Sequence, residues 1–189
     1  MSASPGSPAL WPDLFGNDDP VEIEIGCGDG AFLAAAAARR PRVNFLGLET
    51  QRPRVRRAEE RLATAGGRVR VLRADATCVV TALVAPASVH AYHVYFPDPW
   101  PKHRHAKRRL FTPRLITAMA RTLVPGGRLL VATDIHGYGW LMRGRILDSG
   151  AFVEIPVDTD HGGLTTAFAR KYRARGRLVY SAAFRTRSL

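Results

Sequence analysis

The sequence predicts an α/β fold in which a mostly parallel sheet of seven strands carries helices on both faces. Three observations lead to this prediction. Short apolar runs alternate with helical runs along most of the chain, glycine-containing turns separate many of them, and 189 residues with 46% hydrophobic content suffice for one core. We expect residues 21–189 to form this single domain. Residues 1–20 are rich in Pro, Gly, Ser and Asp, so we expect a flexible arm there.

The first half of the chain alternates strictly between strands and helices. Residues 21–26 alternate apolar and acidic side chains like a strand, and the alanine-rich residues 31–40 favour a helix. A second strand follows at 43–49, then a helix at 52–65 that two glycines close, then a third strand at 69–75. Repeated strand–helix units of this kind indicate a parallel sheet.

The second half continues the pattern and then breaks it. The expected elements are a strand at 89–96, a helix at 113–124, a strand at 128–134, a helix at 136–150, and closing strands at 151–157 and 177–184. The last two strands follow one another without an intervening helix. We therefore expect an antiparallel edge at this end of the sheet.

Composition excludes several classes of protein. No run approaches the 18 apolar residues of a membrane span, so we expect no membrane association. The first ten residues have neither a basic start nor an apolar stretch, which favours a cytoplasmic protein over a secreted one. Two cysteines make neither a disulfide scaffold nor a zinc site, so we expect no metal and no disulfide-linked partner.

The net charge of +12, from 28 Lys and Arg against 16 Asp and Glu, indicates a polyanionic partner. A bias toward arginine in a GC-rich genome is the alternative explanation. The basic residues cluster at 52–61, 102–109 and 170–177. Glutamates interrupt the first cluster at helical spacing, which is typical of a solvated helix face. The second cluster contains no acid and follows a proline-rich loop, so it is the better candidate for the rim of a site.

A glycine turn links the first strand to the first helix. Gly26, Gly28 and Gly30 stand in E-I-G-C-G-D-G, where positive φ or contact with a ligand requires glycine and the following helix offers free N–H groups. With Ala31 the motif also matches the G-x-G-x-x-A of dinucleotide-binding folds, and Glu49 lies where those folds bind a ribose. A turn without any ligand is the third possibility.

Acidic residues at three successive strand ends favour a nucleoside that carries no pyrophosphate. Glu24 would repel phosphates but suits a cationic group, Glu49 can accept from ribose hydroxyls, and Asp75 with Ala76 can accept from an adenine amino group. Any one of these acids alone would be an ordinary solvent-exposed strand end. Together with the glycines they predict a pocket for S-adenosylmethionine.

The segment YFPDPWPKHRHAKRRL follows the fourth expected strand and is the most specific stretch of the chain. Two prolines hold Asp98 and Trp100 in a stiff loop, at the edge where open parallel sheets bind ligands. Trp100 can stack on a planar base, and the basic run can hold phosphates. The alternatives are that Trp100 belongs to the core and that His103 with His105 binds a metal, although no further ligand completes such a set.

These motifs resemble the bacterial tRNA (guanine-N7-)-methyltransferase family, of the TrmB type. The resemblance covers nearly the whole chain: LFGN before the first strand, EIGCGDG, GLE, Asp75 with Ala76, FPDPWPKHRHAKRR, Thr133 with Asp134, and a closing T-x-F motif. It implies a Rossmann-like class I S-adenosylmethionine-dependent methyltransferase fold. It also implies methylation of guanine N7 in tRNA, at a guanosine of the variable loop.

The motifs and the resemblance together assign three sets of residues. The expected donor-binding residues are Glu24, Gly26, Gly28, Gly30, Glu49, Asp75, Ala76 and Asp98, and Asp98 is also the expected catalytic residue. The expected substrate and RNA contacts are Trp100, Lys102, Arg104, His105, Lys107, Arg108, Arg109, Asp134, Thr166, Phe168 and Ala169. No residue is assigned to a metal.

The chain departs from the family pattern at two positions near the expected base pocket. Ala169 stands where the family has a glutamate, and Ile135 stands where an aromatic residue often follows the Thr-Asp pair. A divergent paralogue that methylates another purine or a small molecule is therefore an alternative. A non-catalytic RNA-binding module and a nicotinamide-binding protein are two further hypotheses.

Overall fold

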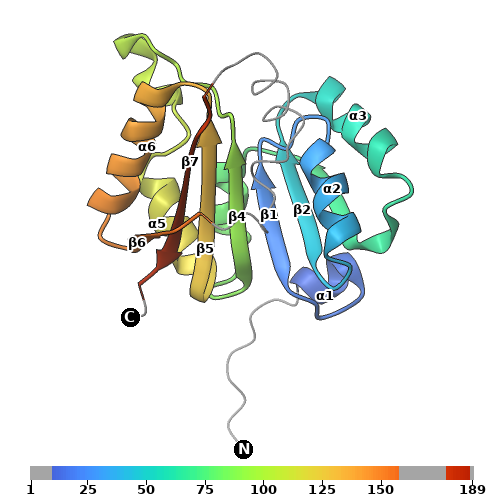
Figure 1. Cartoon of the computed structure of the whole chain (residues 1–189). Helices are drawn as coiled ribbons and strands as arrows, with labels where there is room; N and C mark the ends of the chain where they lie inside the picture. The colour runs from blue at the N-terminus through green and yellow to red at the C-terminus, as the bar shows by residue number, and fades with distance from the viewer. Residues whose placement is uncertain (1–9, 158–177, 188–189) are drawn as a thin grey trace, which may run out of the picture.

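The computed structural model describes residues 10–157 and 178–187, which form one seven-stranded sheet with helices on both faces (Figure 1). The strands are β1 Val21–Ile25, β2 Asn44–Glu49, β3 Val69–Arg73, β4 Val89–Tyr95, β5 Leu123–Thr133, β6 Phe152–Ile155 and β7 Tyr180–Thr186. Their order is β3-β2-β1-β4-β5-β7-β6. The first five strands are parallel, and β7 pairs antiparallel with both β5 and β6, which confirms the expected antiparallel edge.

Two apolar cores lie on the two faces of the sheet. The helices are α1 Leu10–Phe15, α2 Ala31–Arg39, α3 Arg52–Leu62, α4 Ala76–Ala82, α5 Pro113–Thr122 and α6 His136–Asp148. Buried residues of α1, α4, α5 and α6 pack on one face, and those of α2 and α3 pack on the other. Alternate residues of each strand point to opposite faces, so β2, β4 and β5 contribute to both cores. The apolar residues of β1 all belong to one core, and its two glutamates lie on the other face.

The sequence prediction missed two helices. Helix α4 follows β3 with only a short connection, and Asp75 begins it by accepting a hydrogen bond from the amide of Cys78 at 3.0 Å. Helix α1 lies inside the stretch expected to be a flexible arm. There Phe15 is buried, while Trp11 and Leu14 pack against the core, because three large apolar side chains within five residues form a helical face.

Smaller differences concern the ends of elements. The helix expected at 52–65 ends at Leu62, and the short 3₁₀ helix Gly66–Arg68 leads into β3. Helix α5 ends at Thr122, and β5 begins at once with Leu123 beside Val89 of β4. The basic run at 102–109 contains the 3₁₀ helix His103–Arg108. The remaining expected strands and helices are confirmed within a few residues.

The parallel strands bring their carboxyl ends to one edge of the sheet. The glycine turn after β1, Glu49 at the end of β2, Asp75 after β3 and the proline-rich loop after β4 therefore meet there. Across residues 10–157 and 178–187, no helix is both long and apolar enough to cross a membrane.

Candidate active site

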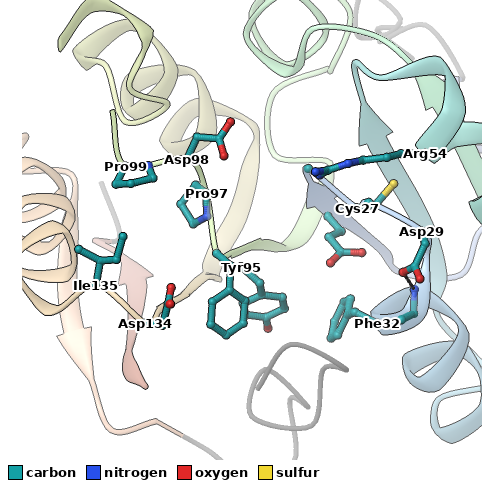
Figure 2. A pocket seen from close by; sticks show the side chains of 15 residues that line it. Cys27, Asp29, Phe32, Arg54, Tyr95, Pro97, Asp98, Pro99, Asp134 and Ile135 are labelled. Atoms are coloured by element: carbon teal, nitrogen blue, oxygen red, sulfur yellow. Dashed lines mark hydrogen bonds between the residues drawn. The ribbon is translucent and has the colours of Figure 1, made fainter. Parts of the chain in front are cut away.

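Two adjoining pockets lie at the carboxyl edge of the sheet, with volumes of about 310 and 250 Å³. The first pocket extends from the glycine turn to Asp134 and Ile135, and Figure 2 shows its lining. The second pocket extends from Glu49 to the start of α4. Both are lined by Gly26 and by Asp98, so the proline-rich loop lies at their junction.

The glycines of the turn have different tasks. Gly26, Gly28 and Gly30 have φ values of 76°, 58° and 75°, which only glycine adopts without strain. A Cβ atom at Gly26 or Gly28 would meet no other atom within 4 Å, so their backbone borders open space. A Cβ atom at Gly30 would lie 3.0 Å from the side chain of Leu62. Gly30 therefore allows α2 and α3 to pack, and the other two glycines leave room for a ligand.

Glu24 contributes a buried carboxylate to the first pocket. Its side chain lies at the end of β1 with 4% of its surface exposed, and its Oε2 atom has no hydrogen-bond partner within the described residues. Burial, together with the nearby charges of Asp29 and Glu49, raises the pKa of Glu24 well above its usual range. Such a carboxyl suits a ligand that brings a cationic hydrogen-bond donor.

Glu49 is held by the backbone around it. Its Oε1 accepts from the amides of Thr50 at 2.8 Å and Gln51 at 3.0 Å, and its Oε2 accepts from the amide of Gly28 at 3.2 Å. Arg54 lies 3.8 Å from Oε2. These bonds fix the carboxylate at the entrance of the second pocket, where it still has acceptor capacity for a ribose hydroxyl.

Asp75 and Ala76 border the far end of the second pocket. The Oδ1 atom of Asp75 caps α4, which leaves Oδ2 as the acceptor without a bond in the described part of the chain. The side chain is exposed, and Ala76 behind it is buried. An adenine amino group could therefore be bound here, at the opposite end of the combined pocket from Glu24.

The proline-rich loop is strained on both sides of Asp98. Phe96 and Trp100 have φ values of 53° and 43°, a region that costs a residue with a side chain about 1–3 kcal/mol. Arg109 holds this conformation, because its guanidinium donates to the carbonyls of Pro99 at 3.3 Å and Trp100 at 3.1 and 3.2 Å. Asp98, whose carboxylate is exposed, borders both pockets, and Figure 2 shows it on the first of them.

The basic run does not act as one unit. Arg109 points inward to the loop, and the guanidinium of Arg108 lies 4.9 Å from the ring centre of Trp100. Trp100 is half-buried beside the second pocket rather than in either core, and His105 packs edge-on against it at 5.5 Å. The side chains of Lys102, Arg104 and Lys107 are exposed. Within the described residues, none of these three side chains bonds to the loop or stacks on the Trp100 ring, and Arg104 donates a long hydrogen bond of 3.4 Å to His105.

The sequence analysis missed a buried polar chain beneath the first pocket. Arg40 donates to Glu22 at 2.5 Å, Glu22 binds His93 Nε2 at 2.7 Å, and His93 Nδ1 binds the hydroxyl of Tyr95 at 2.8 Å. Tyr95 and Phe32 line the pocket, and their rings pack edge to face at 5.0 Å. The sequence did contain a signal for this network: Glu22 and His93 are polar residues within two strands that are otherwise buried.

Burial and hydrogen bonding together indicate which members of this buried polar network are charged. Burial alone would raise the pKa of Glu22, but the hydrogen bond to His93, together with the charge and hydrogen bond of Arg40, outweighs it and lowers that pKa to about 2. Burial lowers the pKa of His93, even though Glu22 acts in the opposite direction. An ionised Glu22 therefore accepts the Nε2 proton of a neutral His93. Nδ1 is then the acceptor, and Tyr95 donates to it.

Asp134 and Ile135 form the side of the first pocket opposite Asp29 and Arg54 (Figure 2). Ile135 is 43% exposed. The structure thus brings the residues expected to bind the donor, Asp98 among them, to one edge of the sheet together with Asp134. Thr166, Phe168 and Ala169 lie outside the described residues.

Sequence comparison relates the chain to methyltransferases. A family model described as "Putative methyltransferase" matches residues 18–182. The tRNA (guanine-N(7)-)-methyltransferase of Nocardia farcinica is 46% identical over 125 residues, which cover 66% of this chain and 46% of that protein. The enzyme of the same name from Treponema pallidum is 33% identical over 193 residues, which cover 96% of this chain and 77% of that protein. The chain thus spans about half the length of the Nocardia relative and most of the Treponema one.

Solved structures share the fold. The 16S rRNA methyltransferase KamB superposes with a TM-score of 0.64 at 20% identity, covering 98% of this chain and 96% of that one. A geranyl diphosphate C-methyltransferase from Streptomyces coelicolor, solved with S-adenosyl-L-homocysteine, gives 0.54 at 14% identity and covers 94% and 73%. These similarities show that the sheet has the expected Rossmann-like methyltransferase architecture.

Proposed function

Because the chain belongs to the tRNA (guanine-N(7)-)-methyltransferase family, we propose that it transfers the methyl group of S-adenosylmethionine to N7 of a guanine in tRNA. The family resemblance points to a guanosine of the variable loop. The geometry that supports the proposal is a set of acidic groups spaced along the two adjoining pockets.

The donor set fits S-adenosylmethionine on its own chemistry. Glu24, with its unpartnered buried oxygen, suits the ammonium group of the methionine half. Glu49 suits the ribose hydroxyls, and the outer oxygen of Asp75 suits the adenine amino group. At Gly26 and Gly28 no side chain covers the backbone, which leaves room for the ligand beside these acids. The unpartnered oxygen of Glu24 is the single observation that carries this assignment, because a turn without a ligand gives no reason to bury it.

Asp98 is the proposed catalytic residue. The bound donor supplies a sulfonium methyl, and guanine N7 has an in-plane lone pair and no proton, so the reaction needs no general base. Positive charge develops on the imidazole half of the purine as the methyl is transferred. The carboxylate of Asp98, fixed by the strained loop at the junction of the pockets, stabilises that charge. Positioning of the base and the donor accounts for the rest of the rate.

Lys102, Arg104 and Lys107 are the proposed phosphate contacts. Their side chains are exposed next to the loop that carries Asp98. They would hold a polyanion beside the pocket by releasing counterions from it, and tRNA affinity would then fall steeply with salt concentration. Asp134 borders the first pocket from the opposite side and is the proposed contact to the guanine edge.

The test is to incubate the protein with bulk tRNA and methyl-labelled S-adenosylmethionine and to identify the labelled nucleoside by mass spectrometry. We expect 7-methylguanosine, and we expect D98N to form it far more slowly while it still binds tRNA. Label in a different nucleoside would identify a divergent paralogue. Donor binding without any labelled RNA would indicate a small-molecule methyltransferase, and tRNA binding without donor binding would indicate an RNA-binding module.

A further inference from the structure

Glu24 lies among acids and has no cation beside it in the described structure. The charges of Asp29, in the glycine turn, and of Glu49, at the end of β2, both act on it. Arg54 borders the same pocket, but it forms its ion pair with Glu49, at 3.8 Å. The titratable or charged groups that face this region are Cys27 and Asp29 from the turn, Glu49 from β2, Arg54 from α3, Tyr95 from β4, and Asp98 and Asp134 from the loops after β4 and β5.

The buried polar chain engages the hydroxyl of Tyr95, so this hydroxyl does not donate to Glu24. Tyr95 lines the same pocket, and its hydroxyl is one of the groups near Glu24 that carry a proton to donate. Tyr95 donates that hydroxyl proton in a hydrogen bond to His93 Nδ1, because Nε2 carries the ring proton and donates it to Glu22. Arg40 keeps Glu22 ionised and so maintains this arrangement. The Oε2 atom of Glu24 consequently has no partner in the described part of the chain.

A buried carboxyl in these surroundings is stable only when it is neutral or when a cation joins it. Desolvation and the two neighbouring carboxylates both disfavour its ionised form. A ligand ammonium placed against Oε2 reverses this balance, because it adds an opposite charge and a hydrogen-bond donor at the same time. The two states of the pocket thus differ by one proton on this residue.

We propose that Glu24 holds a proton in the free protein and releases it when the ammonium group of the methyl donor binds, so that donor uptake is coupled to proton release. The inference rests on the proposed function, because it takes the ligand to be S-adenosylmethionine. The O–H bond of the Glu24 carboxyl breaks, the electron pair stays on the carboxylate, and the proton passes to the buffer. The ligand keeps its own ammonium proton throughout, since α-amino groups have pKa values of about 7.7–8.0 and the measurement is made at pH 6.5.

The experiment is calorimetric titration of the full chain with S-adenosyl-L-homocysteine, which retains the ammonium, ribose and adenine of the donor. Two buffers of the same pH and ionic strength are used, one with a small and one with a large enthalpy of ionisation. Their difference in observed enthalpy gives the number of protons exchanged. We expect roughly one proton released for each ligand bound, which in turn makes the affinity rise with pH.

Two variants assign the proton. In Glu24→Gln the amide cannot ionise, so we expect weaker binding with no dependence on the buffer. Asp75→Asn is the matched control: it is the same exchange of acid for amide at the adenine end, and it should weaken binding while the proton is still released. Should Glu24→Gln fail to fold, the proton count of the wild-type protein still tests the coupling, because binding without proton release would overturn it.

The outcomes separate this inference from the proposed function. Wild-type protein that does not bind the ligand would overturn the proposed function itself. Binding with the same enthalpy in both buffers would leave that function standing and overturn the proton coupling. Proton release that persists in Glu24→Gln would place the proton on another group, such as Asp29 or Glu49, and would equally refute the role of Glu24.

Discussion

Replacing Arg109 by alanine is expected to slow methyl transfer without changing the electrostatic part of tRNA binding. Sequence reasoning placed Arg109 among the phosphate contacts of the basic run. In the structure its guanidinium instead donates to the carbonyls of Pro99 and Trp100, and the side chain is half-buried. We therefore expect it to position Asp98 rather than to bind RNA.

The magnitude follows from those bonds. Hydrogen bonds that involve a charged group contribute about 1.5–3 kcal/mol, and the alanine variant leaves both carbonyls without their donor. Phe96 and Trp100 already hold unfavourable φ values, so the loop would relax toward other conformations once the bonds are lost. If that free energy is the cost of returning Asp98 to its place, turnover falls roughly 10- to 100-fold.

The assay combines single-turnover methylation with tRNA binding at several salt concentrations. Lys107→Ala is the matched control, because Lys107 stands two residues earlier in the same run and its side chain is exposed. Each lost phosphate contact lowers the slope of log K against log salt by about 0.7–0.9. We expect that change in Lys107→Ala with its single-turnover rate nearly unaltered, and the opposite combination in Arg109→Ala.

A reduced salt slope in Arg109→Ala together with a wild-type single-turnover rate would refute the reasoning. It would mean that Arg109 leaves the loop to reach a phosphate and that Asp98 keeps its position without it. Arg109→Lys adds a further check, because a single ammonium cannot reproduce the two-carbonyl fork and should restore only part of the rate.

Four further predictions concern other parts of the molecule. Asp98→Asn should lower the single-turnover rate by about 100-fold while tRNA affinity changes little, and equal rates would exclude charge stabilisation. Asp75→Ala should weaken donor binding by about 1–3 kcal/mol in calorimetry and also lower the unfolding free energy by about 1 kcal/mol, because the residue caps α4. Folding lowers the pKa of Glu22 from 4.5 to about 2. Its ionised form therefore adds about 3 kcal/mol to the free energy of unfolding above pH 4.5, and this contribution is lost as the pH falls toward 2. In denaturant unfolding, Glu22→Gln should accordingly have a lower free energy of unfolding than the wild-type protein at pH 7, and the difference should shrink at pH 3. An equal difference at both pH values would contradict this. Gly139→Ala should lower the melting temperature, because a Cβ atom there would lie 2.5 Å from the ring of Tyr180, whereas Gly137→Ala, where a Cβ atom meets nothing within 4 Å, should be tolerated far better.

Most of the fold and the donor pocket could be predicted from the sequence because their signals are local. The apolar residues of the strands and helices recur with clear periods. The glycines of the turn indicate a backbone with positive φ, which other residues rarely adopt. The acids at 24, 49 and 75 each end or follow a parallel strand, and parallel strands end at the same edge. Local patterns were therefore enough to bring these residues together.

Helices α1 and α4 were harder to predict because tertiary packing decides them. The stretch before Val21 has the composition of a loose arm, but burial of Phe15 outweighs its weak helix propensity. Helix α4 begins so soon after β3 that no turn residue marks the boundary, and a side-chain cap takes the place of one. In both cases the burial that stabilises the helix comes from packing against core residues of segments distant in sequence.

The class of fold, the acids at the strand ends and the basic loop could all be read from the sequence, since each of them depends on residue types at short, regular spacings. Only the tertiary structure decided how individual side chains within those patterns are used. It turned Arg109 inward while Lys107 stayed exposed, and it joined Glu22 to His93 across 71 positions. Among the described residues it left the Oε2 atom of Glu24 without a hydrogen-bond partner. The physical reason is that hydrogen-bond partners and burial are properties of a position in space, which residues far apart in the chain determine together.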